Sequence, residues 1–253
     1  MNLRQWFDAD KVVEIHCHCL PGLDDGPSSW DESLDLCHMM ALQGITDVVA
    51  TPHQLGYYDG QNSPSLVRQR VGELNDRLEA AGILLNVHPG GDVRIDERLP
   101  QLLAQGKVLT LGDAGQYLLL ELFREVPLDP QGLLAALLDG GVIPIVSHPE
   151  RYPWVARQPR LIGRWLELGA GIQITAGSLT GDFGPAVQQA AWKMIRLPGL
   201  VLVASDAHDT VRRPPRLLNA AQLIAQQLGP LRAKALCIDG PVRIGQPVGI
   251  PGV

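Results

Sequence analysis

The stretch VVEIHCHCLPGLDDG, residues 12–26, decides the fold of this chain. Its apolar beginning predicts a short buried strand, and the two-residue period of a strand places His16 and His18 on one face where that strand ends. The Pro-Gly pair that follows breaks the strand, and a turn brings Asp24 and Asp25 back toward the same point. Imidazole nitrogens and carboxylate oxygens that converge in this way outline a site for a first-row metal ion.

The rest of the chain alternates apolar segments typical of buried strands with amphipathic segments typical of helices. We expect seven strands, at residues 12–15, 46–50, 83–87, 117–122, 142–146, 171–175 and 200–204. We expect helices at residues 29–43, 63–81, 130–138, 161–168 and 183–196. This alternation predicts an α/β fold built on a parallel sheet.

A single closed barrel explains why polar residues follow so many of these strands, because the active site of such a barrel lies at the carboxyl ends of its strands. Candidate site residues stand at the ends of six of the seven expected strands: His16 and His18, His53, Asp92, Glu121, His148, and Asp206 with His208. An open doubly wound sheet is the structural alternative, but it would gather its ligand at one crevice. Gly44, Gly82, Gly140 and Gly169 fall between a helix and the next strand, as barrel loops require.

Length and composition fit one barrel. A chain of 253 residues is typical of a single α/β barrel domain, and 45% hydrophobic residues supply a sizeable core. We expect the barrel domain to span residues 1–236. Residues 237–253 are rich in glycine and proline, so we expect a tail with little helix potential there.

The charge of the chain argues against a nucleic-acid partner, which normally requires a basic face, because the net charge is -6 and the isoelectric point is near 5.6. An acidic chain can still bind phosphate where bound cations supply the positive field. The first ten residues lack the apolar core of a signal peptide, and no run reaches the roughly 18 apolar residues of a membrane helix. We therefore expect a cytoplasmic protein without membrane insertion, and its four cysteines form no disulfide framework.

Glu121 carries a signal of its own, because it lies inside the apolar run LLLEL. A carboxylate buried there would be costly unless it is paired or bound to a metal ion, so we expect it to be a ligand. Asp206 and His208 repeat the spacing of His16 and His18 at another strand end. Together these endings predict a polynuclear metal centre, because they offer more donors than the four to six positions of one ion.

The motifs HCH, LPGLDDG, ATPH, GGD, LLLEL, SHPERY, ITAGSL and ASDAH, in this order, resemble those of the PHP superfamily of polymerase-associated and histidinol-phosphatase-like phosphoesterases. Within it, DDGP, HPERY, TAGSLTGDFG and RPP are most similar to the manganese-dependent protein-tyrosine phosphatases of bacterial capsule and exopolysaccharide loci. The resemblance covers about residues 10–236. It implies a distorted (β/α)7 barrel that holds three metal ions, with manganese expected and iron or zinc as alternatives.

The resemblance also implies the ligands. Carried over by motif, these are His16, His18, Asp25, His53, Glu121, His148, Asp206 and His208. Asp92 stands where the family usually has glutamate in a Gly-x-Glu motif, so its side chain is one methylene shorter. We expect Asp92 to be the ninth ligand, with its bridging role and the metal preference as open points.

A polynuclear centre can activate water near neutral pH, hold phosphoryl oxygens and offset their charge. Phenolate, with a pKa near 10 for tyrosine, leaves without a strong general acid. Arg151, three residues after His148, and Arg213 are the expected phosphate-binding catalytic residues, since guanidinium groups form forked bonds to phosphate. The resemblance implies that the substrate is the phosphorylated, tyrosine-rich tail of a membrane-linked kinase that controls polysaccharide export.

Three alternatives remain at this point. A cysteine phosphatase needs Cys-x5-Arg at a helix start, and the spacing from Cys237 to Arg243 fits, although Pro241 interrupts that loop. A second alternative is another PHP reaction, such as histidinol phosphate hydrolysis or nuclease editing. A third is a metal-binding regulatory protein that has lost turnover. The sequence does not give the oligomeric state.

Overall fold

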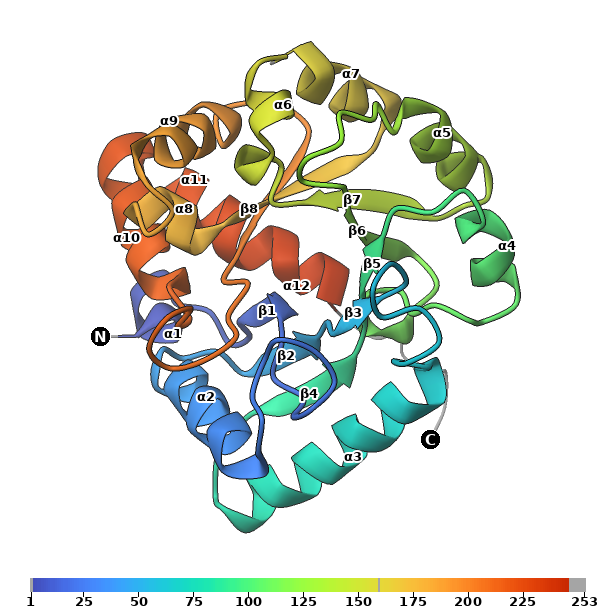
Figure 1. Cartoon of the computed structure of the whole chain (residues 1–253). Coiled ribbons are helices and arrows are strands. Elements are labelled where there is room, and N and C mark those ends of the chain that lie inside the picture. The colour runs from blue at the N-terminus through green and yellow to red at the C-terminus, as the bar shows by residue number, and fades with distance from the viewer. Residues whose placement is uncertain (1, 159, 246–253) are drawn as a thin grey trace.

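The apolar segments form parallel strands in the computed structural model, which describes residues 2–158 and 160–245 (Figure 1). The strands are β1 Val13–Cys17, β2 Asp47–Ala50, β3 His53–Gln54, β4 Asn86–Pro89, β5 Asp92–Arg94, β6 Tyr117–Glu121, β7 Ile143–Ser147, β8 Gly171–Thr175 and β9 Leu200–Ala204. Neighbouring strands pair in parallel in the orders β1-β2-β4 and β3-β5-β6-β7-β8-β9. The carboxyl ends of the strands therefore face one side of the molecule.

Two of the expected strands are bent, so that each is divided into two segments. β2 continues into β3, and β4 continues into β5 after Gly90 and Gly91. Both glycines allow close packing at the bend, since a Cβ on Gly90 would lie 2.6 Å from Cγ1 of Val49 and one on Gly91 would lie 2.5 Å from Oε1 of Gln54. With each bent pair counted once, the described chain has seven barrel strands. The predicted distorted (β/α)7 barrel is confirmed.

The barrel closes where the end of β1 meets the end of β9. The backbone N–H of His18 donates to the carbonyl oxygen of Ala207 at 2.9 Å. The buried carboxylate of Glu14 adds a second link, because it accepts the N–H of His16 at 2.9 Å and the N–H of Ser205 at 2.8 Å. This closure brings the histidines after β1 next to the Asp-x-His motif after β9.

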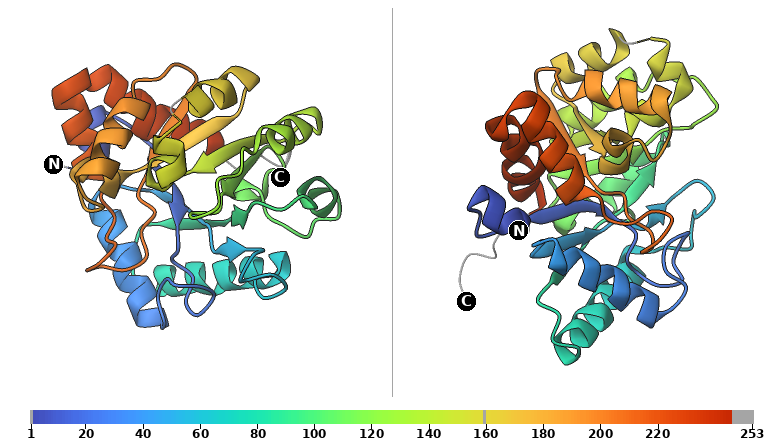
Figure 2. Two further views of the ribbon diagram at one scale, coloured as in Figure 1. Left: turned by 45° about the horizontal axis from the view of Figure 1, so that its top comes forward. Right: turned by 90° about the vertical axis from the view of Figure 1, so that its left-hand side faces the viewer.

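Helices surround the ring of strands (Figure 2). The longer ones are α2 Trp30–Leu42, α3 Pro64–Ala80, α5 Gln131–Asp139, α7 Arg160–Leu168, α9 Pro185–Met194 and α10 Leu217–Leu228. The shorter ones are α1 Leu3–Phe7, α4 Leu99–Ala104, η1 Leu111–Asp113, η2 Pro149–Arg151, α6 Pro153–Ala156, α8 Ala176–Thr180, α11 Pro230–Lys234, η3 Ala235–Asp239 and α12 Gly240–Gly245. All five expected helices are present, with ends shifted by one or two residues. Ser29 and Ser63 cap α2 and α3 by accepting backbone N–H groups.

The expectation of an unstructured tail is wrong for residues 237–245. This segment forms η3 and α12, and α12 crosses the middle of the ring of strands in Figure 1. Ile244 is buried with the inward-facing side chains of the barrel, and a Cβ on Gly245 would lie 2.5 Å from Cγ1 of Val13. Low helix propensity is overridden here by tertiary packing. Residues 246–253 lie outside the described part of the chain.

One smaller expectation also needs correction. The strand expected at residues 83–87 begins three residues later, because the chain turns after α3 with the N–H of Leu85 bonded to the carbonyl of Ile83. Gly140 lies between α5 and β7 as expected, and the left-handed residue of that connection is Gly141, with φ of 81°. Among the described helices, none combines the length and apolar character needed to cross a membrane.

Candidate metal centre

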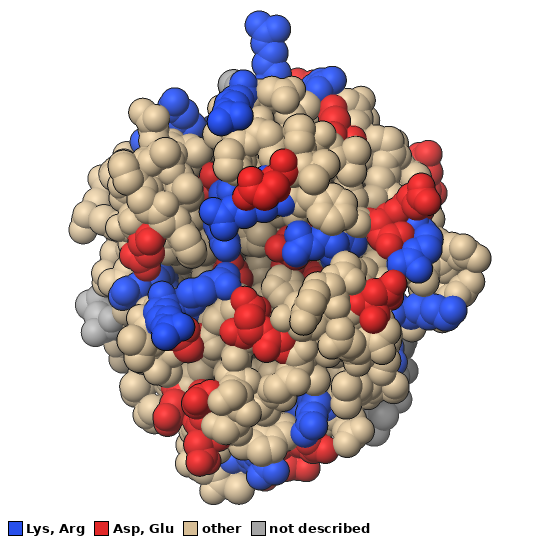
Figure 3. All heavy atoms as spheres, viewed as in Figure 1, with Lys and Arg blue, Asp and Glu red and all other residues tan. Residues whose placement is uncertain are grey.

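All nine predicted ligands meet at the carboxyl ends of the barrel strands. They form four groups, and within each group one donor atom per residue lies within 4.8 Å of the others. The groups are His18, Asp25, His53 and His208; His16, His148 and Asp206; His16, His18 and Asp92; and His53, Asp92 and Glu121. Residues shared between groups make the four a single cluster. In the view of Figure 3, basic and acidic side chains gather near the centre of this face.

His16 and His18 turn their Nε2 atoms toward each other. The two atoms are 3.3 Å apart and lie 3.2 and 3.6 Å from the same oxygen, Oδ1 of Asp206. The other nitrogen of each ring is held from outside, Nδ1 of His16 by Gln173 at 2.9 Å and Nδ1 of His18 by Asp24 at 2.6 Å. Such outer partners orient metal-binding imidazoles, so both rings are fixed with Nε2 directed into the cluster.

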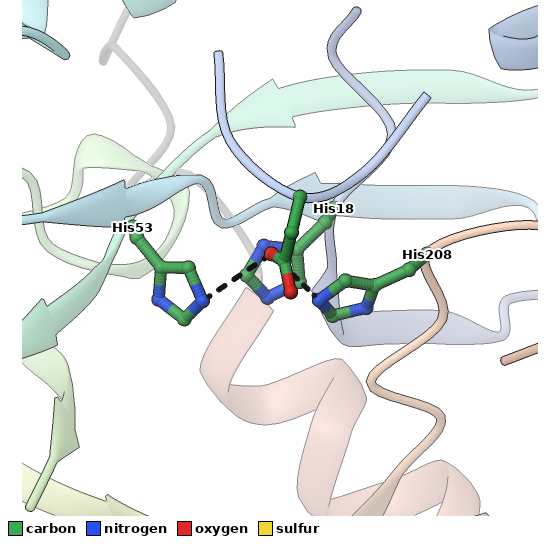
Figure 4. A group of neighbouring side chains, drawn as sticks. His18, His53 and His208 are labelled. Carbon is green, nitrogen blue, oxygen red and sulfur yellow. Dashed lines mark ion pairs between the residues drawn. The ribbon is translucent and has the colours of Figure 1, made fainter. Parts of the chain in front are cut away.

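Asp25 joins imidazoles from two distant parts of the chain, His53 of β3 and His208 after β9. Its Oδ1 lies 3.5 Å from Nε2 of His53 and 3.2 Å from Nε2 of His208, and Figure 4 shows both rings directed at this carboxylate. The ring of His18 stacks on that of His208, with 3.9 Å between centroids. The side chain of Asp25 is 54% exposed. It therefore marks the solvent side of the cluster.

Asp92 lies between two groups. Its Oδ2 is 3.7 Å from Nε2 of His16 and 3.5 Å from Nδ1 of His53, and Nδ1 of His53 is 3.4 Å from Oε2 of Glu121. The shorter side chain at this position thus still reaches both groups. The parallel register explains the placement, because β3 pairs with β5 so that His53 and Asp92 are direct neighbours.

Arg151 and Arg213 converge on Asp206 from two different loops. Nη1 of Arg151 forms a short ion pair with Oδ2 of Asp206, and Nη2 of Arg213 lies 2.6 Å from the same oxygen. Nη1 of Arg213 also lies 3.6 Å from Asp25. His148 and Asp206 have φ of 36° and 53°, a left-handed conformation that is unusual for residues other than glycine. Strain of this kind is typical of functional sites.

Burial and charge give the histidines different protonation states. Burial lowers the pKa of His16 to about 4 and that of His18 to about 3, so both rings are neutral at pH 7 and have lone pairs to donate. Burial also opposes a charge on His53, but Asp25, Asp92 and Glu121 raise its pKa to about 9. Burial and the neighbouring Glu121 hold the pKa of Asp92 well above its usual range. The positively charged groups around Asp92 are therefore too few to keep this carboxyl group ionised.

The donor set fits metal ions. Among the described residues, neither oxygen of the fully buried Asp92 has a hydrogen-bond donor, and Nδ1 of His53 and Nε2 of His208 have no hydrogen-bond partner. Buried polar atoms without partners are rare and costly. Cations at this point would satisfy all of them, and mixed imidazole and carboxylate donors suit manganese, iron and zinc.

Asp24 lies at the point to which the sequence directs it, and it supports the nine proposed ligands from outside, because its carboxylate holds His18 and accepts the N–H of His53 at 3.0 Å. Three further residues of the site are not among those that the sequence predicts. Glu14 and Gln173 interrupt the apolar runs VVEIH and GIQIT, the same signal that identified Glu121. Arg94, whose Nη2 lies 2.7 Å from Oε2 of Glu121, follows Asp92 by two residues and so shares its strand face.

The other two of the seven histidines lie away from the cluster. His38 is exposed on α2, and Nε2 of His88 is 2.8 Å from Asp47. All four cysteines are buried and free, and burial raises the pKa of the Cys237 thiol. Cys237 therefore stays in the protonated, unreactive thiol form. The cysteine-phosphatase alternative lacks an accessible nucleophile.

Known proteins share this arrangement of sequence and fold. A family model described as "Capsular polysaccharide synthesis, CpsB/CapC" matches residues 12–245. Tyrosine-protein phosphatase YwqE of Bacillus subtilis is 36% identical over 220 residues, which cover 86% of this chain and 85% of that protein. Putative tyrosine-protein phosphatase CapC of Staphylococcus aureus is 34% identical over 204 residues, or 80% of this chain and 79% of that protein.

Comparison with solved structures also finds proteins of similar fold. One from work on YwqE of Bacillus subtilis and CpsB of Streptococcus pneumoniae, described as unique metal-dependent tyrosine phosphatases, has a TM-score of 0.83 and 33% identity. The match covers 92% of this chain and 90% of that one. An organophosphorus hydrolase from Deinococcus radiodurans has a TM-score of 0.57 at 13% identity, over 95% of this chain and 94% of that one, so it shares the fold alone.

Proposed function

Because the chain belongs to the CpsB/CapC family, we propose that it is a metal-dependent protein-tyrosine phosphatase. The observation that carries the proposal is the meeting of nine imidazole and carboxylate side chains at one end of the barrel, with Arg151 and Arg213 beside them. Hydrolysis of a phosphomonoester needs a centre that can bear the charge on the phosphoryl oxygens, and this combination provides one.

The proposed ligands are His16, His18, Asp25, His53, Asp92, Glu121, His148, Asp206 and His208. We propose three ions, with manganese expected and iron or zinc as alternatives. The four overlapping groups support more than one ion, because nine donors exceed the coordination positions of one. When bound, the ions would act as Lewis acids that lower the pKa of water and neutralise phosphoryl charge.

The side chains of the protein then have three tasks. Arg151 and Arg213 bind phosphoryl oxygens, and Asp206 holds both guanidinium groups in place. The guanidinium carbon of Arg151 also lies 4.6 Å from the ring centroid of Phe183, which restricts it further. Asp24 and Gln173 orient the two histidines of β1. The leaving phenolate needs no strong general acid, because the pKa of tyrosine is only about 10.

The proposed substrate is a phosphotyrosine-containing protein, specifically the tyrosine-rich tail of a bacterial kinase that controls capsule or exopolysaccharide synthesis. The names of the relatives support this proposal, since they are tyrosine-protein phosphatases and the matching family model describes capsular polysaccharide synthesis. The cytoplasmic location expected from the sequence stays a prediction.

A substrate comparison tests the proposal. The purified protein is stripped of metal, reconstituted with manganese, zinc or iron, and assayed on a phosphotyrosine peptide, histidinol phosphate and single-stranded DNA. We expect metal-dependent turnover with the phosphotyrosine peptide as the preferred substrate. Preference for histidinol phosphate or DNA would favour another reaction of the superfamily, and full metal content without any turnover would favour a regulatory protein.

A further inference from the structure

A hollow of about 210 Å³ lies directly beside the cluster, where the ligands Asp25, His53 and Glu121 form one of its sides. Clefts that hold drug-sized ligands measure roughly 300 to 1,000 Å³, so this hollow has room for one side chain rather than a folded segment. Its outer side is formed by the rings of Tyr57 and Tyr58 and by the side chain of Arg94. Arg94 pairs with the proposed ligand Glu121, whereas neither tyrosine has a role in the metal cluster proposed above.

The two tyrosines are presented by a strained turn after β3. Leu55 is buried with φ of 64°, a conformation that a bulky residue rarely adopts, and Gly56 follows with φ of 59°. The N–H of Tyr58 closes the turn on the carbonyl oxygen of Leu55 at 3.0 Å. The ring of Tyr58 then lies nearly parallel to that of His53, with centroids 5.6 Å apart and 17° between the planes.

The second ring completes an aromatic corner. Tyr57 meets Tyr58 edge to face, with centroids 5.1 Å apart and 85° between planes, while 86% of Tyr57 is exposed. A large aromatic residue exposed to that degree beside a metal centre has no packing function in the described chain. Aromatic pairs prefer edge-to-face and offset-stacked contacts, so a phenyl ring entering the hollow can make such a contact with these rings.

Arg94 lines the same hollow and is held by several contacts. Its Nη1 donates to the carbonyl of Leu122 at 2.7 Å, its Nη2 pairs with Glu121, and its guanidinium carbon lies 5.8 Å from the ring centroid of Phe123. On the other side, a Cβ on Gly56 would lie 3.0 Å from Cγ of Arg94. A guanidinium group held flat in this way can stack on an aromatic ring.

A second hollow beside Asp25 is less suited to an aryl group. It has a volume of about 380 Å³. Its lining contains Arg212 and the imidazole of His208 but also the carboxylates of Glu32, Asp35 and Asp209, and it contains no Phe, Tyr or Trp. Carboxylates favour water or cations over a phenyl ring. The two hollows therefore differ in chemistry, and the aromatic one is the better match for the organic part of an aryl phosphate.

We propose that Tyr57, Tyr58 and Arg94 form an aryl wall that receives the phenyl ring of phosphotyrosine and selects it over alkyl phosphates. The inference rests on the proposed phosphatase function, because it assigns a position to the leaving group of that reaction. Tyr58 contributes its ring face, and its hydroxyl group is not required. The wall sets specificity, whereas the ligands and arginines described above act on the phosphoryl group.

Binding of two phosphonates that cannot be hydrolysed tests the wall independently of turnover. Titration calorimetry on the manganese-loaded protein compares phenylphosphonate with methylphosphonate. We expect the wild type to bind the phenyl compound about 10-fold more tightly, the order of one buried aromatic contact. Tyr58→Leu should abolish this preference and Tyr58→Phe should keep it, with metal content measured for each. Tyr57→Ala is a second variant on an exposed side chain and should reduce the preference.

Tyr117→Leu is the matched control, because it removes the same ring at the amino end of β6, away from the hollow. It should leave the phosphonate preference unchanged. Equal binding of the two phosphonates by the wild type, or an undiminished preference in metal-loaded Tyr58→Leu and Tyr57→Ala, would overturn the wall while leaving phosphotyrosine hydrolysis intact. Conversely, a protein that hydrolyses no phosphotyrosine peptide but shows the phenyl preference would disprove the proposed function and retain the wall.

Discussion

Three residues apart in the sequence, His148 and Arg151 have different partners. His148 is buried within a ligand group with His16 and Asp206, whereas Arg151 reaches the cluster only through its ion pair with Asp206. Because Arg213 bonds to the same oxygen of Asp206, the removal of Arg151 leaves that carboxylate with one guanidinium partner. Metal binding and phosphate binding should therefore be separable by single substitutions.

We expect Arg151→Ala to retain full metal content and to lower kcat/KM for an aryl phosphate by about 10- to 1,000-fold, because a charge-stabilising contact in the transition state is lost. We expect His148→Ala to lose metal and activity together. Elemental analysis beside steady-state kinetics distinguishes the two. Arg164→Ala is the control, since Arg164 forms a half-exposed ion pair with Asp129 and should behave as the wild type. Wild-type kinetics in Arg151→Ala would mean that its role is wrongly assigned.

Glu150, between these two residues in the sequence, has an unusually high pKa for a carboxyl group. Its Oε1 accepts the N–H of Thr175 at 2.9 Å and the hydroxyl of Ser178 at 2.7 Å, while its buried Oε2 has no hydrogen-bond partner among the described residues. Burial raises its pKa to about 7 from 4.5. The folded state therefore holds a proton that the unfolded state releases between pH 4.5 and 7, and Glu150 destabilises the fold increasingly as the pH rises through this window.

Glu150→Gln should remove this dependence, because an amide oxygen can accept both bonds and no charge is buried. We expect the free energy of unfolding of the variant to exceed that of the wild type by less than about 1 kcal/mol at pH 5 and by about 3 kcal/mol at pH 8. Guanidinium titrations of both proteins at the two pH values, in the same metal concentration, provide the measurement. A difference that does not change with pH would contradict it.

At the scale of elements, the strand ends were predictable and the connections between them were less so. His16, His53 and Glu121 could be predicted as site residues, because a polar side chain at the end of or within an apolar run costs free energy when it is buried. Glu14 and Gln173 give the same signal, but their partners come from β9 and β7, and such pairings depend on register that single-sequence patterns do not contain.

The last helices show the opposite difficulty. Residues 237–245 carry glycine and proline, and local propensity therefore predicts no helix. Yet Gly245 is required because Val13 approaches its Cα closely, and the burial of Ile244 stabilises the helix from outside its own sequence. Tertiary contacts of this kind leave little trace in a local pattern.

Ile244→Ala tests whether α12 belongs to the core. A buried isoleucine truncated to alanine costs about 2 to 5 kcal/mol, so we expect a loss of this size in the free energy of unfolding. Leu231→Ala in α11 is the matched control, because that side chain is 84% exposed and its truncation should cost less than about 0.5 kcal/mol. Equal effects of the two substitutions, measured by chemical denaturation, would show that α12 is dispensable.

For the whole molecule, the metal centre and the barrel depend on each other. Asp92, Glu121 and Asp206 are drawn together at one end, and burial raises the pKa of Asp92 and Glu121. Cations would offset this accumulation of charge. The proposed ligands lie within or just after β1, β3, β5, β6, β7 and β9, so any ion bound here would join distant parts of the chain.

We therefore expect more than one metal ion per chain by elemental analysis under metal-replete conditions. Chelation should lower the Tm by about 5 to 10 °C, the effect of a ligand present at about 100 times its Kd, and manganese should restore it. His38→Ala, on an exposed helix position, is the control and should retain the wild-type metal content. One ion or fewer per chain, or a Tm that chelation leaves unchanged, would contradict the polynuclear centre.

The link between Glu14 and Ser205 also bears on how the protein is made. These residues are 191 positions apart, so during translation one edge of β1 has no neighbour until β9 has left the ribosome. His16 and His18 are synthesised early, but Asp206 and His208, which complete their groups, are among the last residues of the barrel to appear. The complete set of donors therefore exists only after most of the chain has been made, and a nascent chain that ends before β9 has no complete site for metal ions.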